Sequence, residues 1–126
     1  MIVGTGVDLI AVKRIQEAVE RHGMRFLSKI FTQNELEYSR GKAREFEHLA
    51  ARFAAKEAVL KAFGTGAAAG VSLRDVEVVN SPNGKPDVVL HGKAYGFAQV
   101  RGVTRIHLSL SHADEYAVAQ VVMEGG

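Results

Sequence analysis

The stretch RFAAKEAVLKAF, residues 52–63, contains neither glycine nor proline, and its apolar residues recur at helical spacing. Extended back to residue 43, the same spacing joins residues that lie three, four, seven and three positions apart, namely Phe46, Leu49, Phe53, Leu60 and Phe63. At about 100° per residue these side chains share one face of a helix. We therefore predict one long helix over residues 43–63, ended by Gly64.

Glu57 falls inside that apolar stripe, four residues after Phe53 and three before Leu60. A buried carboxylate is costly unless it is paired, hydrogen-bonded or bound to a cation. Lys56 lies at the border of the stripe, and Lys61 follows Glu57 by four residues, which suits a helical ion pair. The helix alone leaves two interpretations open: a structural Glu57–Lys61 pair at the edge of the core, or a carboxylate that binds a cation.

The composition is that of an ordinary globular protein, with 47% hydrophobic and 24% charged residues, and we expect one domain over residues 1–126. There is no cysteine, so a metal site would use Asp, Glu, His or backbone oxygens, and carboxylates favour Mg²⁺, Ca²⁺ or Mn²⁺. The first residues lack a signal-peptide pattern, and no apolar run is long enough to span a bilayer. We therefore expect a cytoplasmic protein with no membrane partner.

The remaining patterns predict an α+β fold in which an antiparallel sheet packs with the long central helix. Residues 2–10 are predicted as a strand, residues 11–22 as a helix closed by Gly23, and Thr32 with Glu35 as the capping box of a short helix. Residues 64–72 are predicted as a loop, 76–79 and 88–90 as a hairpin, and 92–100 as a helix. Two further strands are predicted over residues 105–112 and 116–123.

The first strand carries glycines on the face of an aspartate. Gly4 and Gly6 share a face with Asp8, and the opposite face carries Val3, Thr5, Val7 and Leu9. Glycines in a strand often mark a close approach by other backbone or by a ligand. Asp8 and Glu57 have no fixed spacing, so by themselves they are weak evidence of a metal site. His112 closes a serine-rich strand, where it fits either a solvated turn or a site.

Arg14, Arg21 and Arg25 are seven and four residues apart, so they would form one basic stripe on a continuous helix, although Gly23 can break the register. Such charges usually form a solvated face. The alternative is a docking surface for an acidic protein or a nucleic acid. The net charge is only +2 and there is no tryptophan, so a base-stacking surface is poorly supported. The segment GTGAAAG, residues 64–70, lacks the lysine of a P-loop.

Four segments, in this order, resemble holo-acyl-carrier-protein synthase, the short bacterial type of 4′-phosphopantetheinyl transferase. They are GTGVDLI (4–10), FTQNELEYSR (31–40), RFAAKEAVLKAFGTG (52–66) and LSLSHADEYAVAQVV (108–122). The resemblance implies transfer of the 4′-phosphopantetheine arm of coenzyme A to a serine of apo acyl carrier protein, in fatty acid biosynthesis, with release of adenosine 3′,5′-bisphosphate. It also implies a homotrimer with active sites between subunits.

The resemblance assigns roles to single residues. Asp8 and Glu57 are implied as ligands of Mg²⁺, and Lys61 as the residue that contacts a phosphate and stabilises the leaving group. The serine proton would pass through a water to Asp8 or Glu57. The implied coenzyme A contacts are Arg44, Arg52, Lys61, Gly64, Thr65, Pro86 and His112. The implied docking residues for the acidic carrier protein are Arg14, Arg21 and Arg25.

Other functions compete with this interpretation. A small basic nucleic-acid-binding protein would fit the isoelectric point near 9.0 but would leave Glu57 unexplained. A metal-dependent phosphohydrolase would use the same carboxylates with water as the acceptor. A purely structural subunit would make the set of Asp8, Glu57, Lys61 and His112 coincidental. The resemblance favours the transferase, with no nucleic-acid partner.

Overall fold

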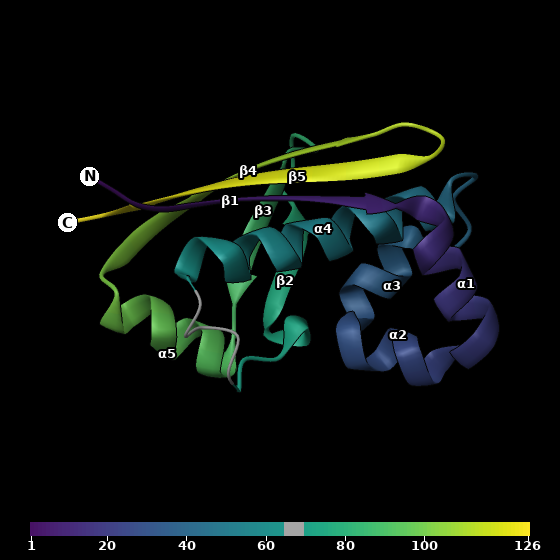
Figure 1. The fold of residues 1–126 in the computed structure, drawn as a ribbon, viewed down its shortest axis with the longest axis horizontal. Coiled ribbons are helices and arrows are strands. Elements are labelled where there is room, and N and C mark those ends of the chain that lie inside the picture. Colours follow the sequence, from purple (N-terminus) through teal and green to yellow (C-terminus); the bar gives the residue numbers. More distant parts are fainter. Residues whose placement is uncertain (65–69) are drawn as a thin grey trace.

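The long helix α4 (Glu45–Phe63) lies against a three-stranded sheet on one side and a β-hairpin on another (Figure 1). The computed structural model describes residues 1–64 and 70–126. The sheet has the order β1-β5-β4, from β1 (Ile2–Ala11), β4 (Val103–His112) and β5 (Tyr116–Gly125), and both pairs are antiparallel. The predicted α+β fold, with an antiparallel sheet on a long helix, is confirmed.

The other elements cover the remaining sides of α4. Three helices lead from β1 to α4 and gather at its N-terminal end: α1 (Val12–His22), α2 (Met24–Ile30) and α3 (Gln33–Ser39) (Figure 1). A 3₁₀ turn, η2 (Leu73–Asp75), precedes a separate two-stranded antiparallel sheet of β2 (Val76–Asn80) and β3 (Pro86–Leu90). Helix α5 (Gly92–Val100) then leads to β4.

Helix α2 was not predicted. It has only seven residues, none of them fully buried, so it carries too short an apolar pattern to be recognised. Gly23 ends α1 with a positive φ of 55° and also precedes the first residue of α2, so no loop separates the two helices. The chain turns there because glycine adopts this backbone conformation without a steric penalty.

Strand β1 and helix α4 touch backbone to backbone. Gly4 and Gly6 face the helix, and a Cβ added at either position would overlap the carbonyl oxygen of Ala62 or Ala58. The side chains that α4 presents there are small and buried, as expected where two backbones approach closely. The glycines therefore allow close approach by other backbone, which was one of the two predicted explanations.

The predicted apolar stripe is not the most buried face of α4. Phe46, Phe53 and Leu60 are only partly buried, whereas Lys56 is completely buried. Small residues must occupy the side that meets the glycines of β1, so these three large residues lie nearer the margin, whereas Leu49 and Phe63 of the stripe are buried as predicted. As a result Glu57 is partly exposed, and not enclosed in the core as its place in the stripe suggested.

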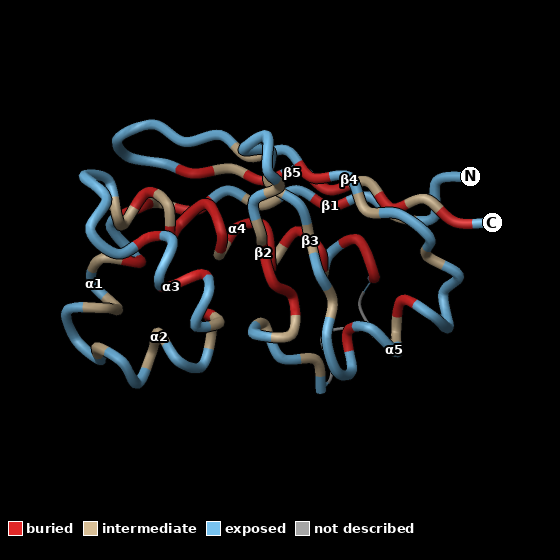
Figure 2. Tube along the Cα trace, turned by 180° about the vertical axis from the view of Figure 1, so that it is seen from behind, coloured by how far each residue is buried: buried red, intermediate tan, exposed pale blue. Residues whose placement is uncertain are grey.

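The sheet is covered by α4 on one face only. Figure 2 shows that buried residues concentrate in α4, β5 and β2. The other face of β1 exposes Val3, Val7 and Leu9, at 40%, 57% and 64% of their surface. Within residues 1–64 and 70–126, no helix has the length and apolar character needed to cross a membrane.

Candidate active site

Lys61 and Asp8 meet where α4 crosses β1. Lys61 Nζ donates to Asp8 Oδ1 at 2.9 Å and to the backbone oxygen of Val7 at 3.0 Å. The Asp8 side chain is 15% exposed and the Lys61 side chain 53% exposed. The chain therefore does not form the structural Glu57–Lys61 ion pair that the sequence left open, because Lys61 pairs with Asp8.

Glu57 lies close enough to Asp8 for their charges to interact. Partial burial raises the pKa of Glu57, the negative charge of Asp8 raises it further, and Lys61 opposes both effects. Among residues 1–64 and 70–126, Glu57 takes part in none of the ion pairs. Two neighbouring carboxylates, one of them unpaired, make this place attractive to a cation.

The donor set fits a hard cation that shares its coordination with a substrate. Within the described parts of the chain, no three side chains of the His, Cys, Asp and Glu types gather as a metal cluster. Mg²⁺ usually binds proteins through one or two carboxylates and takes its other ligands from water and substrate phosphates. Asp8 and Glu57 satisfy that requirement, since both offer carboxylate oxygens on neighbouring elements.

A cavity of about 420 Å³ opens beside Lys61. Its lining combines backbone and side chains of β1 with two side chains from α4 and β5, namely Thr5, Gly6, Val7, Lys61 and Gln120. Among the described residues β1 pairs with β5 and forms one edge of the three-stranded sheet. A phosphate group placed here would lie within reach of the Lys61 ammonium group.

His112 and Arg44 form a second cluster beside β4, at the opposite edge of the sheet from β1. The Glu47 carboxylate accepts a hydrogen bond from His112 Nδ1 at 3.0 Å and lies 3.4 Å from Arg44. Arg44 also pairs with Asp114 at 3.3 Å, in the turn between β4 and β5. The His48 ring lies edge-on to His112, with 5.5 Å between ring centroids. The predicted residues Arg44 and His112 are thus brought together.

Arg52 extends this second cluster towards the hairpin. Its guanidinium donates to Asn80 Oδ1 at 2.6 Å and lies 4.1 Å from the centre of the Tyr38 ring. Arg52 is only 3% exposed, and burial lowers its pKa. Burial also lowers the pKa of His48, helped by the positive charges of Arg52, His112 and Lys42. The cluster therefore brings two arginines and two histidines together with the carboxylates of Glu47 and Asp114, and the basic side chains could exchange these carboxylates for an anionic ligand.

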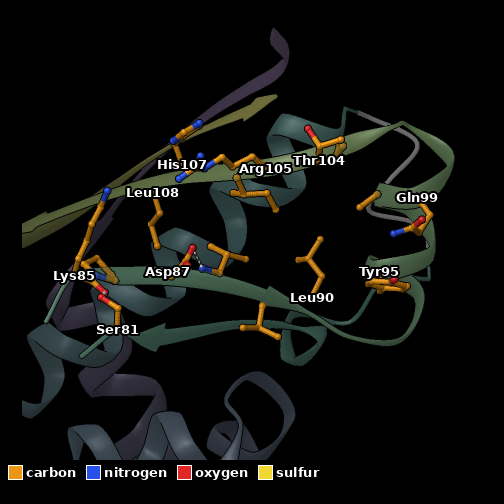
Figure 3. Close-up of a pocket in the computed structure, with 16 residues that line it drawn as sticks. Ser81, Lys85, Asp87, Leu90, Tyr95, Gln99, Thr104, Arg105, His107 and Leu108 are labelled. Carbon is orange, nitrogen blue, oxygen red and sulfur yellow. Dashed lines mark hydrogen bonds between the residues drawn. The ribbon is translucent and has the colours of Figure 1, made fainter. Parts of the chain in front are cut away.

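The hairpin, α5 and β4 line a cavity of about 610 Å³ (Figure 3). Pro86 lines it at the start of β3, together with Lys85 from the turn. Figure 3 shows Leu90 of β3 and Leu108 of β4 projecting into the space between the two strands, at different positions along them. Gly64 ends α4 with φ 100°, and Thr65 lies outside the described residues.

The two clusters lie on different sides of α4. Arg52 precedes Glu57 by five residues, which places their side chains about 140° apart around the helix axis. Glu57 looks towards Asp8 on β1, whereas Arg52 contacts Asn80 at the end of β2. One chain therefore does not bring all the predicted coenzyme A contacts to one place.

Comparison with known proteins bears on this arrangement. The sequence model of the 4′-phosphopantetheinyl transferase superfamily matches residues 4–121. A holo-[acyl-carrier-protein] synthase of Koribacter versatilis is 51% identical over 124 residues, covering 98% of this chain and 99% of the relative. The chain belongs to the holo-[acyl-carrier-protein] synthase family.

Solved structures of holo-[acyl-carrier-protein] synthases have the same fold as this chain. The enzyme from Neisseria meningitidis has a TM-score of 0.89 at 35% identity, covering 98% of this chain and 99% of that one. The enzyme from Bacillus anthracis, solved in complex with CoA (3′,5′-ADP), has a TM-score of 0.80 at 41% identity, covering 100% and 99%. Membership of this family leaves the nucleic-acid-binding and phosphohydrolase alternatives without support.

Sequence reasoning missed several residues of the second cluster in this member of the holo-[acyl-carrier-protein] synthase family. Glu47 and His48 were not singled out, although Arg44, His48 and Arg52 follow one another at four-residue spacing. That spacing aligns three cationic side chains on one face of a helix. Tyr38, which stacks under Arg52, gave no comparable signal because its partner is distant in sequence.

The predicted docking arginines are exposed but do not share one helix. Arg14 and Arg21 belong to α1, whereas Arg25 belongs to α2, beyond the turn at Gly23. None of the three forms an ion pair within residues 1–64 and 70–126. They remain available to an acidic partner, which is consistent with the prediction without testing it.

Proposed function

We propose that Asp8, Glu57 and Lys61 form the reaction centre of this holo-[acyl-carrier-protein] synthase. The chain transfers the phosphopantetheine group of coenzyme A to acyl carrier protein. The observation that carries the assignment of the centre is the convergence of these three side chains, from β1 and α4, beside a cavity. The serine oxygen of the carrier protein forms a bond to the β-phosphorus of coenzyme A. The bond from that phosphorus to the bridging oxygen breaks, and adenosine 3′,5′-bisphosphate leaves.

Asp8 and Glu57 are the residues that would hold Mg²⁺. When bound, Mg²⁺ offsets the negative charge that develops on the pyrophosphate group. Lys61 would contact a phosphate oxygen and stabilise the leaving group. Its side chain is half exposed, so its ammonium group can exchange the Asp8 carboxylate for a phosphate oxygen, and the mostly buried Asp8 would then pair with the bound cation instead.

The serine hydroxyl must lose a proton during the transfer. Asp8 and Glu57 are the candidate acceptors, directly or through a water. Burial and the charge of Asp8 raise the pKa of Glu57, and Asp8 is paired with Lys61, so Glu57 is the carboxylate that is free to accept the proton. A carboxylate with a raised pKa holds a proton more readily.

The second cluster would bind the nucleotide half of coenzyme A. Arg44 and His112 are partly exposed and share Glu47, so they can reach a phosphate. Arg52 is enclosed between Tyr38 and Asn80, and would act by holding the hairpin and adding positive charge. Pro86 and the segment of Gly64 and Thr65 complete the proposed contacts.

A homotrimer with sites between subunits would join the two halves. A single chain places the reaction centre and the nucleotide cluster on different sides of α4, so a neighbour is needed to bring them together. The exposed apolar face of β1, which carries Val3, Val7 and Leu9, is a surface of the kind that subunits bury. These two features support the trimer.

The carrier protein would dock on α1 and α2. Acyl carrier proteins are acidic, and Arg14, Arg21 and Arg25 are exposed. Charge pairs at a surface mainly steer and orient a partner, and they weaken with salt. A cytoplasmic location, where coenzyme A and the carrier protein meet, is part of this proposal.

The deciding experiment is intact-mass analysis of an apo acyl carrier protein incubated with this protein, coenzyme A and Mg²⁺. We expect a phosphopantetheine adduct with the wild type and with Glu37→Gln, an exposed control on α3, and none with Glu57→Gln. An adduct formed by Glu57→Gln would show that the Glu57 carboxylate has only a structural role. The absence of any adduct with several carrier proteins would overturn the proposed transfer.

A further inference from the structure

Lys56 is a fully buried lysine that the proposed reaction does not use. Its ammonium group donates to Glu35 Oε1 at 2.8 Å, to the Val76 carbonyl at 2.6 Å and to the Leu73 carbonyl at 3.2 Å. Both side chains of the Lys56–Glu35 pair are 0% exposed. All three N–H groups of the lysine are therefore used, and each of them ties α4 to a different point of the surrounding chain.

Glu35 is fixed as firmly as its partner. Its Oε1 accepts from the backbone N–H of Thr32 at 2.8 Å, which completes the capping box at the start of α3. Its Oε2 accepts from the backbone N–H of Val78 in β2 at 2.8 Å. The Lys56–Glu35 pair consequently joins α3, α4, η2 and β2 through directional bonds.

The opposite side of α4 is held by a contact of a different kind. There the backbone of the helix rests on Gly4 and Gly6 of β1, where no side chain intervenes. On the helix, Glu57 is the residue next to Lys56, and Lys61 lies five positions after Lys56. The rotation of α4 about its axis thus sets the direction in which both side chains point relative to Asp8.

We infer that the buried Lys56–Glu35 pair is a positioning device that fixes the rotation of α4, and thereby holds Glu57 and Lys61 against Asp8. The inference rests on the proposed function, in which those three residues form the reaction centre. Lys56 contacts neither substrate nor cation in this proposal. It acts through the helix backbone, as a positioning residue.

An ion pair suits this task better than an apolar side chain would. Burying two charges adds little net stability compared with apolar residues of the same volume, and is often slightly destabilising. The pair does, however, require one geometry, because an ammonium group turned away from Glu35 and the two carbonyls would be left buried without partners. An apolar side chain at position 56 would tolerate several small rotations of the helix.

The test removes both charges at nearly constant size with the double variant Lys56→Met/Glu35→Gln. Glutamine at position 35 can still complete the capping box, so α3 should keep its start. Three quantities are measured: the melting temperature, the dissociation constant of Mn²⁺ as a paramagnetic probe without coenzyme A, and the kcat and KM of the transfer. We expect the Mn²⁺ dissociation constant to rise about 10- to 100-fold, as when partners that orient metal ligands are removed. We expect kcat to fall about 10-fold or more, with little change in the KM for coenzyme A.

Val59→Ala is the matched control, because Val59 is also fully buried on α4 but carries no directional bond. It should lower the melting temperature while leaving the Mn²⁺ dissociation constant unchanged. An unchanged Mn²⁺ dissociation constant in the folded double variant would overturn the inference. So would a rise of the same size in Val59→Ala, because general loosening of the helix would then explain both.

Two further cases separate failure of this inference from misfolding and from failure of the proposed function. If circular dichroism finds the double variant unfolded, Lys56→Met alone decides, because it removes all three directional bonds of the ammonium group, and an unchanged Mn²⁺ dissociation constant in that folded variant refutes positioning. If the wild type binds Mn²⁺ but forms no adduct, the proposed function fails, and the Mn²⁺ comparison still tests whether the pair sets the geometry of the two carboxylates.

Discussion

Lys61 of α4 donates a hydrogen bond of 2.9 Å to Asp8 of β1, so the cation and one carboxylate of the proposed reaction centre neutralise each other in the free protein. Lys61 is therefore a competitor of any metal ion for Asp8. Lys61 can bind the leaving phosphate only after its hydrogen bond to Asp8 breaks. Binding of phosphate by Lys61 and binding of metal by Asp8 are therefore linked.

The first prediction follows from that competition. Lys61→Met should lower kcat by about 100-fold or more, the range found when one group that stabilises developing charge is removed. The same variant should bind Mn²⁺ at least as tightly as the wild type, because Asp8 loses its internal cation. Steady-state rates and Mn²⁺ titration measure the two effects separately. Weaker Mn²⁺ binding would mean that Lys61 supports the carboxylates and does not compete for them.

A second prediction concerns the contact of β1 with α4. Gly6→Ala places a Cβ against the Ala58 carbonyl oxygen, so the helix must move away from the strand. We expect a loss of stability of about 1–3 kcal/mol, typical of overpacking, together with weaker Mn²⁺ binding. Gly96→Ala, in α5 with open space around it, is the control and should be neutral or stabilising by about 0.5–1 kcal/mol. A Gly6→Ala variant as stable as the wild type would contradict the close approach.

The third prediction tests whether sites are shared between subunits. Glu57→Gln and His112→Ala should each be inactive alone, yet mixed oligomers formed by co-refolding should regain activity. With random mixing, roughly a quarter of the interfaces carry an intact half from each chain. Intact-mass analysis of the carrier protein reports the recovery. Mixtures that stay inactive, although native mass spectrometry detects mixed oligomers, would argue for a site within one chain.

A fourth prediction concerns docking of the carrier protein. Arg14→Glu should raise the KM for acyl carrier protein more than the KM for coenzyme A, because the arginine is exposed on α1, far from the coenzyme A contacts in sequence. The difference between variant and wild type should shrink as salt is added. Arg74→Glu, an exposed arginine of η2, controls for the change of net charge. Equal effects on both KM values, or none, would count against docking at α1.

The fifth prediction is a dependence of stability on pH. Burial raises the pKa of Glu77, but hydrogen bonds from Thr32, His91 and Asn34 outweigh it, so the pKa lies below the usual 4.5. A carboxylate with a lowered folded-state pKa contributes stability above its unfolded pKa and loses it as pH falls through the folded value. The melting temperature of Glu77→Gln should thus lie below that of the wild type at neutral pH and approach it under acid conditions. Glu37→Gln, on the exposed surface, should run parallel to the wild type throughout.

The fold was predictable from the sequence wherever a pattern was long. The helix over residues 43–63 and the strands near residues 2–10, 105–112 and 116–123 each carry enough periodic residues to declare their type, and the structure confirms them. Helix α2 is too short for that and lies directly after the glycine turn. The burial of α4 was mispredicted because size, and not only polarity, decides which face meets β1: alanine and glycine pack there, and Phe46 and Phe53 lie at the margin.

The residues of the proposed reaction centre were predicted from motifs, but the pairing among them was not. Four-residue spacing suggested Glu57 with Lys61, whereas the strand supplies Asp8 as the real partner of the lysine. Such a partner lies 53 residues away in sequence, where no local spacing rule applies. The sequence likewise predicts Lys56 only at the border of the apolar stripe of α4, because its partners Glu35 and Val76 come from distant segments.

The glycines of β1 also affect how this protein would respond to systematic mutagenesis. An alanine scan identifies important positions by deleting atoms, but at Gly4 and Gly6 alanine adds an atom, and at Ala58 and Ala62 it changes nothing. In such a scan the glycines of the strand would therefore report the effect of an added methyl group, and the alanines of the helix would report nothing. Serine or valine would have to be substituted at the alanine positions to measure how strongly the geometry of the proposed centre depends on small side chains in this contact.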